Sequence, residues 1–157
     1  GILYCSAEAN SVYQADVVKA ALEAKGVNVT VYTFADSNDV ATVTQTACSE
    51  NDALYIPTDN TAASCTEAIN NVAEPAGVPI VAGEEGICKG CGIATLSIDY
   101  YELGRTTGAM AAKILTGESK VEEMPIEYAP EFTKEYNPTI AEALGITIPD
   151  DYVAYEG

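Results

Sequence analysis

The stretch YIPTDNTAAS, residues 55–64, decides the fold class of this chain of 157 residues. An apolar run that begins at Ala53 stops at Pro57, and a polar cluster then leads into a series of small helix-forming residues. Acids, amides and hydroxyls at such a junction either cap the first turn of a helix or hold a ligand. The stretch therefore predicts a strand that passes directly into a helix, with a candidate site at the junction.

The same alternation of strand and helix extends in both directions from this stretch. Runs of apolar and β-branched residues predict strands at 1–5, 27–35, 52–59, 78–83 and 93–99. Helical spacing and capping residues predict helices at 9–26, 36–51, 60–77, 100–116 and 137–145. This order predicts an α/β protein, a parallel sheet of four or five strands with helices on both faces, and residues 2–5 in its interior.

One further strand is expected after the longest predicted helix. The segment MPIEYAPEF, residues 124–132, has apolar and aromatic residues, but Pro130 has no backbone N–H to give to a sheet. We therefore expect this strand at an edge.

Composition excludes several classes of function. Hydrophobic residues make up 48% of the chain and charged residues 20%, which is typical of a globular domain. The formal charge of −17 argues against a nucleic-acid partner, because no basic patch is available to neutralise phosphates. The chain has no histidine, which excludes His-based catalytic triads and His-metal sites. We therefore expect no metal site.

The chain has five cysteines, and an odd number leaves at least one without an intramolecular partner. The sequence CKGC, residues 88–91, is followed by Gly92 and a predicted strand, so it lacks the strand-to-helix context of a catalytic dithiol. A structural disulfide or unreactive thiols are the alternatives. The sequence leaves the state of all five open: Cys5, Cys48, Cys65, Cys88 and Cys91.

Polar residues gather where the predicted strands end, and ligands of open parallel sheets bind at that edge. The candidate ligand-binding residues are Ser6, Glu8, Asn10, Ser11, Thr58, Asp59, Asn60, Glu84, Glu85 and Asp99. Helix N-termini favour an anion and the acids favour a cation, a combination that suits a zwitterion such as an amino acid. Helix capping alone is the alternative for most of them. It does not explain GEEG, residues 83–86, because no helix is predicted there, and an ordinary exposed acidic turn is the alternative.

Five blocks of the sequence together resemble the ABC-transporter substrate-binding proteins of the tryptophan/tyrosine-binding type. They are GILYCSAEANS (1–11), DALYIPTDNTAAS (52–64), VPIVAGEEG (78–86), ATLSIDYYELGRTTGAMAAKIL (94–115) and AEALGITIP (141–149). The resemblance implies a type I periplasmic-binding fold of two α/β lobes. It implies a small solute, often an aromatic amino acid, held between the lobes and passed to a membrane permease. It also implies no enzyme activity and no cofactor. The expected location is outside the cytoplasm, as a membrane-anchored lipoprotein or a periplasmic protein.

The resemblance also implies that residues 1–157 are the C-terminal lobe of a longer protein. The strand-like run that begins directly at Gly1 fits this expectation. Helix 100–116, with an apolar stripe at Tyr100, Leu103, Thr107, Met110 and Ile114, would pack on the first lobe. Without that lobe, we expect the chain to self-associate. The family pattern differs at CKGC and at Cys5, where small or apolar residues are usual.

Two other classes share the alternating topology. A receiver-type protein needs paired acids after the first strand, which GILYC does not supply. A flavodoxin needs a phosphate loop there, and Glu8 would repel phosphate. The sensor domain of a transcription regulator has the same fold, and only the segment before it would distinguish it.

Overall fold

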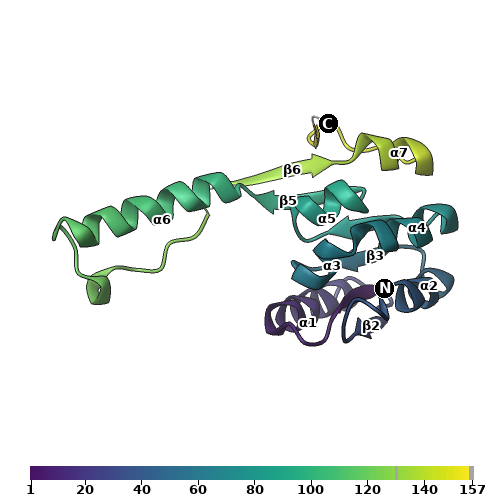
Figure 1. The fold of residues 1–157 in the computed structure, drawn as a ribbon. Coiled ribbons are helices and arrows are strands. Elements are labelled where there is room, and N and C mark those ends of the chain that lie inside the picture. The colour runs from purple at the N-terminus through teal and green to yellow at the C-terminus, as the bar shows by residue number, and fades with distance from the viewer. Residues whose placement is uncertain (130, 156–157) are drawn as a thin grey trace.

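A computed structural model describes residues 1–129 and 131–155, and within them the chain forms one sheet of seven strands (Figure 1). The strands lie in the order β2-β1-β3-β4-β5-β6-β7. Their bounds are β1 (Ile2–Cys5), β2 (Val31–Phe34), β3 (Leu54–Ile56), β4 (Ile80–Ala82), β5 (Ala94–Ile98), β6 (Phe132–Tyr136) and β7 (Val153–Ala154).

The predicted parallel α/β sheet is confirmed for β1 to β5, which all run parallel to one another. Strand β1 lies between β2 and β3 and all four of its residues are buried, so the predicted interior position of residues 2–5 is also confirmed. Strand β6 is antiparallel to β5, and β7 pairs with its far side.

The strand predicted at 124–132 is wrong in both place and setting. Residues 124–129 form no strand, and β6 begins at Phe132 because its pairing with β5 begins there, opposite Ile98. The strand is interior rather than at an edge, because β7 covers its other side. Pro130, on which the edge prediction rested, lies outside the described residues.

The helices follow most of the predicted segments. Their bounds are α1 (Ala9–Glu23), α2 (Val40–Glu50), α3 (Asn60–Ser64), α4 (Thr66–Ala76), α5 (Glu85–Gly90), α6 (Tyr100–Leu115) and α7 (Pro138–Leu144), with a 3₁₀ turn η1 (Val121–Glu123). The predicted helix 60–77 is divided into α3 and α4 at Cys65, whose φ of −120° and ψ of 16° interrupt the helix. Asn137 caps α7 as predicted, accepting bonds from the backbone N–H groups of Thr139 and Ile140.

The core lies on both faces of the sheet, as expected for this class. On one face, Leu3, Phe34 and Ile56 pack in a cluster that also contains Ile69 of α4 and Ile87 of α5. On the other face, a smaller cluster holds Ile2 and Tyr4 of β1 together with Ala15 of α1. The helices on these two faces leave the carboxyl ends of β1, β3, β4 and β5 along one edge, where the candidate residues lie.

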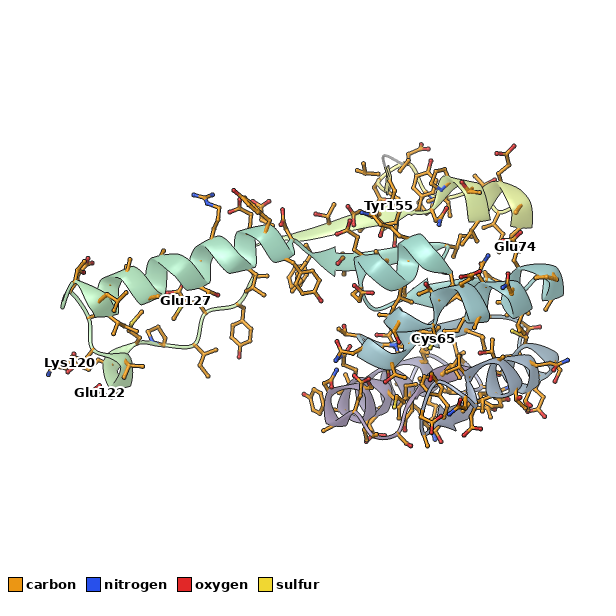
Figure 2. The ribbon with its side chains drawn as sticks, in the orientation of Figure 1. Cys65, Glu74, Lys120, Glu122, Glu127 and Tyr155 are labelled. Atoms are coloured by element: carbon orange, nitrogen blue, oxygen red, sulfur yellow. The ribbon has the colours of Figure 1, made fainter. Side chains whose placement is uncertain are left out.

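Helix α6 leaves the rest of the fold and projects beyond the sheet, and the chain returns beside it to β6 (Figure 1). None of its residues is buried. Figure 2 shows Lys120 and Glu122 at the far end of this projection and Glu127 on the returning segment. Among the described residues, α6 and every other helix are too short or too polar to cross a bilayer.

Gly83 tests how closely the loops after β3 and β4 approach each other. A Cβ atom at this position would lie 2.7 Å from both Pro57 C and Thr58 N, which are backbone atoms. We expect Gly83→Ala to lower the free energy of unfolding by about 1–3 kcal/mol. Gly104→Ala is the matched control, because no atom lies within 4 Å of a Cβ built there. It should stabilise α6 by up to about 1 kcal/mol. Urea unfolding of both variants measures this, and equal effects would contradict the close approach.

Candidate functional site

The carboxylate of Glu8 binds the N-terminus of α3 and links the loop after β1 to the loop after β3. Its Oε2 accepts bonds from Asn60 N at 2.9 Å and Asn60 Nδ2 at 3.0 Å. Its Oε1 accepts bonds from Thr61 N at 2.8 Å and Thr61 Oγ1 at 2.7 Å. Burial acts to raise the pKa of Glu8, but these four bonds outweigh it and the pKa lies below its ordinary value. The backbone N–H groups expected to meet a ligand anion are therefore occupied by an anion of the lobe itself.

Asp59 is a buried carboxylate, with 1% of its surface exposed, that joins the same two loops from below. Its Oδ2 accepts a bond from Cys5 N at 2.7 Å, and its Oδ1 accepts a bond from Ala62 N at 2.8 Å. The first bond fixes the end of β1 and the second caps α3. Because of its burial, Asp59 supports the edge from beneath and does not line it.

Thr58 connects α1 to the loop after β4. Its backbone O accepts bonds from Asn10 Nδ2 at 2.8 Å and Ser11 Oγ at 3.2 Å, and its own Oγ1 donates to Gly83 O at 3.3 Å. Its backbone N donates to Gln14 Oε1 at 3.0 Å. Gln14 is not among the residues predicted from the sequence, although its position one helical turn after Asn10 was an available signal.

The structure thus brings seven of the ten candidates together, in the loops after β1 and β3 and in the first turns of the helices that follow them. One of the seven has not yet been described: Ser6, whose hydroxyl donates a hydrogen bond to Phe34 O at 3.3 Å and so links the loop after β1 to β2. The hydroxyl and amide groups of these candidates donate to acceptors within the lobe. The acceptor is a backbone oxygen in every case but one, and the exception is the exposed Asn60 amide, which donates to Glu8.

Glu84 and Glu85 lie at the start of α5, which corrects the expectation that no helix follows GEEG. Glu84 caps this helix, accepting bonds from the backbone N–H groups of Gly86 and Ile87. Glu85 forms an ion pair with Lys89, one turn later. The helix has six residues, too few for an apolar period to appear in the sequence, and it forms because Ile87 and Cys88 are buried beneath it.

Asp99 is exposed and caps α6, accepting bonds from Tyr101 N at 2.8 Å and Glu102 N at 3.0 Å. It borders a hollow of about 200 Å³ that Glu102, Glu131 and Thr133 also line. The next residue, Tyr100, has its pKa raised by burial and by the charge of Glu84. The ends of β4 and β5 therefore face the same space. Tyr100 is a half-exposed aromatic residue at this position, and its sequence pattern predicted only a place in the apolar stripe of the helix.

The open part of this edge is acidic. Glu84, Glu85 and Asp99 lie on it, and Lys89 neutralises only Glu85. The neighbouring Glu135 of β6 has its pKa raised by burial and then by the charge of Glu85. An edge of this kind attracts a cationic group. Within the described part of the chain, no three acids, cysteines or histidines are arranged to hold a metal ion.

The CKGC cysteines lie in α5 and at its end, so the predicted absence of a helix is wrong here too. Both are buried, and burial raises the pKa of Cys88 to about 11 and that of Cys91 to about 12. At neutral pH both are thiols, which are poor nucleophiles. All five cysteines are free. Tyr155 lies over α5 (Figure 2), with its OH donating to Glu85 O at 3.3 Å and its ring 5.0 Å from Lys89 Nζ.

Comparisons with known proteins place the whole chain in one group. Residues 1–156 match the family described as ABC transporter substrate binding protein. The tyrosine-binding protein of Clostridioides difficile (strain R20291) is 31% identical over 126 residues, which are 80% of this chain and 36% of that protein.

Solved structures agree with that match. An ABC domain in complex with L-Trp from Streptococcus pneumonia has a TM-score of 0.87 and 32% identity, over 96% of this chain and 50% of that one. A conserved domain protein from Vibrio cholerae O1 biovar eltor has a TM-score of 0.89 and 30% identity, over 98% and 53%. The ligand-free, open structure of a substrate binding protein with adhesive properties from Clostridium difficile has a TM-score of 0.76 and 32% identity, over 99% and 54%. The chain thus spans between a third and about half of the length of these proteins.

Asp59→Ala tests whether the buried carboxylate holds the two loops together. The substitution leaves the N–H groups of Cys5 and Ala62 without their acceptor, and we expect the free energy of unfolding to fall by about 2–4 kcal/mol. Asp39→Ala is the matched control, because Asp39 occupies the N-cap of α2 without a side-chain cap bond. It should cost less than about 0.5 kcal/mol. Urea unfolding compares the two, and a loss of similar size in both would refute the role of Asp59.

Thiol labelling tests the state of the CKGC pair. At pH 8 the raised pKa values keep Cys88 and Cys91 protonated and burial keeps reagent away, so neither should react with iodoacetamide in the folded protein. The half-buried Cys65 should react first. Both protected thiols should react in urea. Mass spectrometry of tryptic peptides reads each site, and rapid native labelling of Cys88 would overturn the assignment.

Proposed function

The chain belongs to the ABC transporter substrate-binding protein family, and we propose that it is the C-terminal lobe of a two-lobed solute-binding protein of an ABC importer. The greater length of the solved relatives supports this division, since this chain covers about half of each. Helix α6, which has no buried residue, packs on the preceding lobe in this proposal. Family membership argues against the flavodoxin, receiver and repressor-sensor alternatives.

The proposed ligand is a small zwitterion, an aromatic amino acid, held between the two lobes. One relative carries the name tyrosine-binding protein, and one solved relative is a complex with L-Trp. In this role the protein works outside the cytoplasm, as a lipoprotein or a periplasmic protein, and passes the ligand to a permease in the membrane. It binds its substrate without converting it, and needs no cofactor.

We propose that this lobe holds the ammonium end of the ligand. The single observation that carries this orientation is the Glu8 carboxylate across the N-terminus of α3. It takes the N–H groups that would otherwise receive a ligand carboxylate, while Asp99 remains exposed to solvent on the same edge. The ligand carboxylate is then bound by the preceding lobe, and the half-exposed Tyr100 offers a ring beside Asp99.

Calorimetric titration of the full-length protein with tryptophan, tyrosine, phenylalanine and leucine tests the ligand class and the role of Asp99. Asp99→Ser keeps a capping oxygen for α6 but removes the charge. If Asp99 binds the ammonium, this variant loses a charge-assisted bond worth about 1.5–3 kcal/mol and binds about ten- to a hundredfold more weakly.

Asp52→Ser is the control, since Asp52 is an exposed acid that precedes β3 at the opposite edge of the sheet. It should bind as the parent does. Equal affinity of Asp99→Ser and the parent would remove Asp99 from the site. Binding of a sugar or a nucleoside, with no amino acid bound, would show that the proposed ligand class is wrong.

A further inference from the structure

One face of the sheet is covered over β1 but open over β4 and β5. The strand register places Tyr55, Val81 and Leu96 on the face that α1 covers at β1. We call these three residues the open sheet face. Val81 is 46% exposed and Leu96 is 55% exposed. Parallel strands are normally covered on both faces, so an apolar surface of this kind is where a further layer packs.

A hollow of about 280 Å³ lies between the open sheet face and α1. Tyr55 and Val81 line it from the sheet, Val18 and Leu22 line it from α1, and Gly1 lines it where the chain leads into β1. Protein interiors are close-packed, so apolar side chains of a further element are expected to fill a hollow with such walls.

The described helices leave the open sheet face to a segment outside residues 1–157. Helices α2, α4 and α5 pack on the opposite face, where Val40, Ile69 and Ile87 are buried in one cluster, and α7 contacts α4. Helix α6 has no buried residue and projects beyond the sheet (Figure 1). In the proposed function α6 packs on the preceding lobe, so it does not cover this face.

The position of Gly1 in the fold gives the route of that segment. Gly1 lies at the amino edge of the sheet, where the parallel strands begin: its N donates to Ala53 O and its O accepts from Tyr55 N, both at 2.8 Å. The preceding lobe faces the opposite, carboxyl edge in the proposed function. Figure 1 shows the N-terminus and the start of α6 on opposite sides of the sheet. A chain that arrives from the preceding lobe therefore runs the length of the strands before it enters β1.

The length of this route suits a helix. Strand β5 has five residues, and at about 3.3 Å per residue the route along it is about 17 Å. A helix that rises about 1.5 Å per residue covers this length in about 11 residues. The solved relatives are about twice as long as this chain, so they contain the additional residues that such a helix needs. A helix antiparallel to the strands and joined to β1 by a short loop is the usual covering layer of an α/β sheet.

We propose that the segment immediately before Gly1 in the full-length protein is an amphipathic helix of about three turns that packs on the open sheet face. We call it the joining helix. The inference rests on the proposed function, because it needs a chain that arrives from a preceding lobe. Apolar residues spaced three and four apart on the joining helix cover Val81 and Leu96 and fill the hollow beside α1.

The joining helix moves with this lobe when the two lobes open or close. Its contacts are with α1 and the sheet, so the flexible part of the connection lies before the helix, at the carboxyl edge. The other connection between the lobes, at Asp99, lies at the same edge. The open sheet face is therefore covered whether or not a ligand is bound.

Photo-crosslinking in the full-length protein tests which segment covers the face. The photoreactive residue p-benzoyl-L-phenylalanine replaces Leu96 in one variant and Val153 in the control, since Val153 is 62% exposed on β7 at the far end of the sheet. Illumination should join position 96 to a peptide within about 20 residues before Gly1, the length of the joining helix with its connections. The control should give no such product.

Thiol labelling tests the cover with a smaller change of side chain. Leu96→Cys in the full-length protein should react with iodoacetamide about tenfold or more slowly than Val153→Cys, because a covered thiol reacts only when the joining helix detaches. Mass spectrometry separates each introduced thiol from the five native ones. An excess of tryptophan should leave the ratio of the two rates unchanged within about twofold, because the cover does not depend on closure of the lobes.

A cross-link from position 96 to a more distant part of the preceding lobe, or to a second copy, would overturn the proposal. Equal labelling of the two cysteines would do the same. Protection of Leu96→Cys that appears only with tryptophan would also contradict it, because closure of the lobes would then provide the cover. If calorimetry finds no amino-acid ligand, the proposed ligand class fails, while the cross-link and the labelling without tryptophan still decide whether the joining helix exists.

Discussion

The buried carboxylate of Asp59 is the contact on which the candidate edge depends. Parallel strands end in loops whose backbone N–H groups have no sheet partner, and Asp59 accepts one such bond from each side of the β1–β3 junction. A single acid therefore fixes the end of one strand and the first turn of the helix after another. Glu8 then binds that turn from outside, and both carboxylates must stay in place for the loops to keep their geometry.

These two acids also explain why the edge is acidic without being disordered. Each carboxylate that lies inside it is satisfied by N–H or O–H donors, so its charge is stabilised where it stands. The acids nearer the surface are secured in a different way, by capping α5 and α6 or by pairing with Lys89. The side chains that produce the negative potential at the surface are thus the same ones that cap or brace the backbone. A substitution that removes one of these charges is therefore expected to lower local stability as well as the attraction for a cationic ligand.

How much of this was predictable depends on whether local sequence or distant contacts decide each feature. The apolar GILYC run indicates an interior strand, and Asp59 lies between a predicted strand and a predicted helix. The topology and the capping role of Asp59 could therefore be predicted from the sequence. Helix α5 was not, because six residues show no period, and β6 was not, because FTKEY is largely exposed and is a strand only through pairing with β5. In the site, the strand ends indicated which residues gather there. The contact of Glu8 with Asn60 and Thr61 joins residues more than fifty positions apart, and no local pattern encodes it.

Because only Asp99 connects β5 to α6, the direction of α6 depends on the backbone angles of this one residue. With no slack between strand and helix, a change in the backbone angles of this residue swings the whole helix. Over a length of about 24 Å, a tilt of about 10° displaces Leu115 by about 4 Å. Asp99 also lines the small hollow at the carboxyl edge, together with Glu102 and Glu131. A molecule that draws the Asp99 carboxylate away from Tyr101 N and Glu102 N therefore acts at the point about which α6 turns. A small movement there produces a large displacement at the far end of the helix.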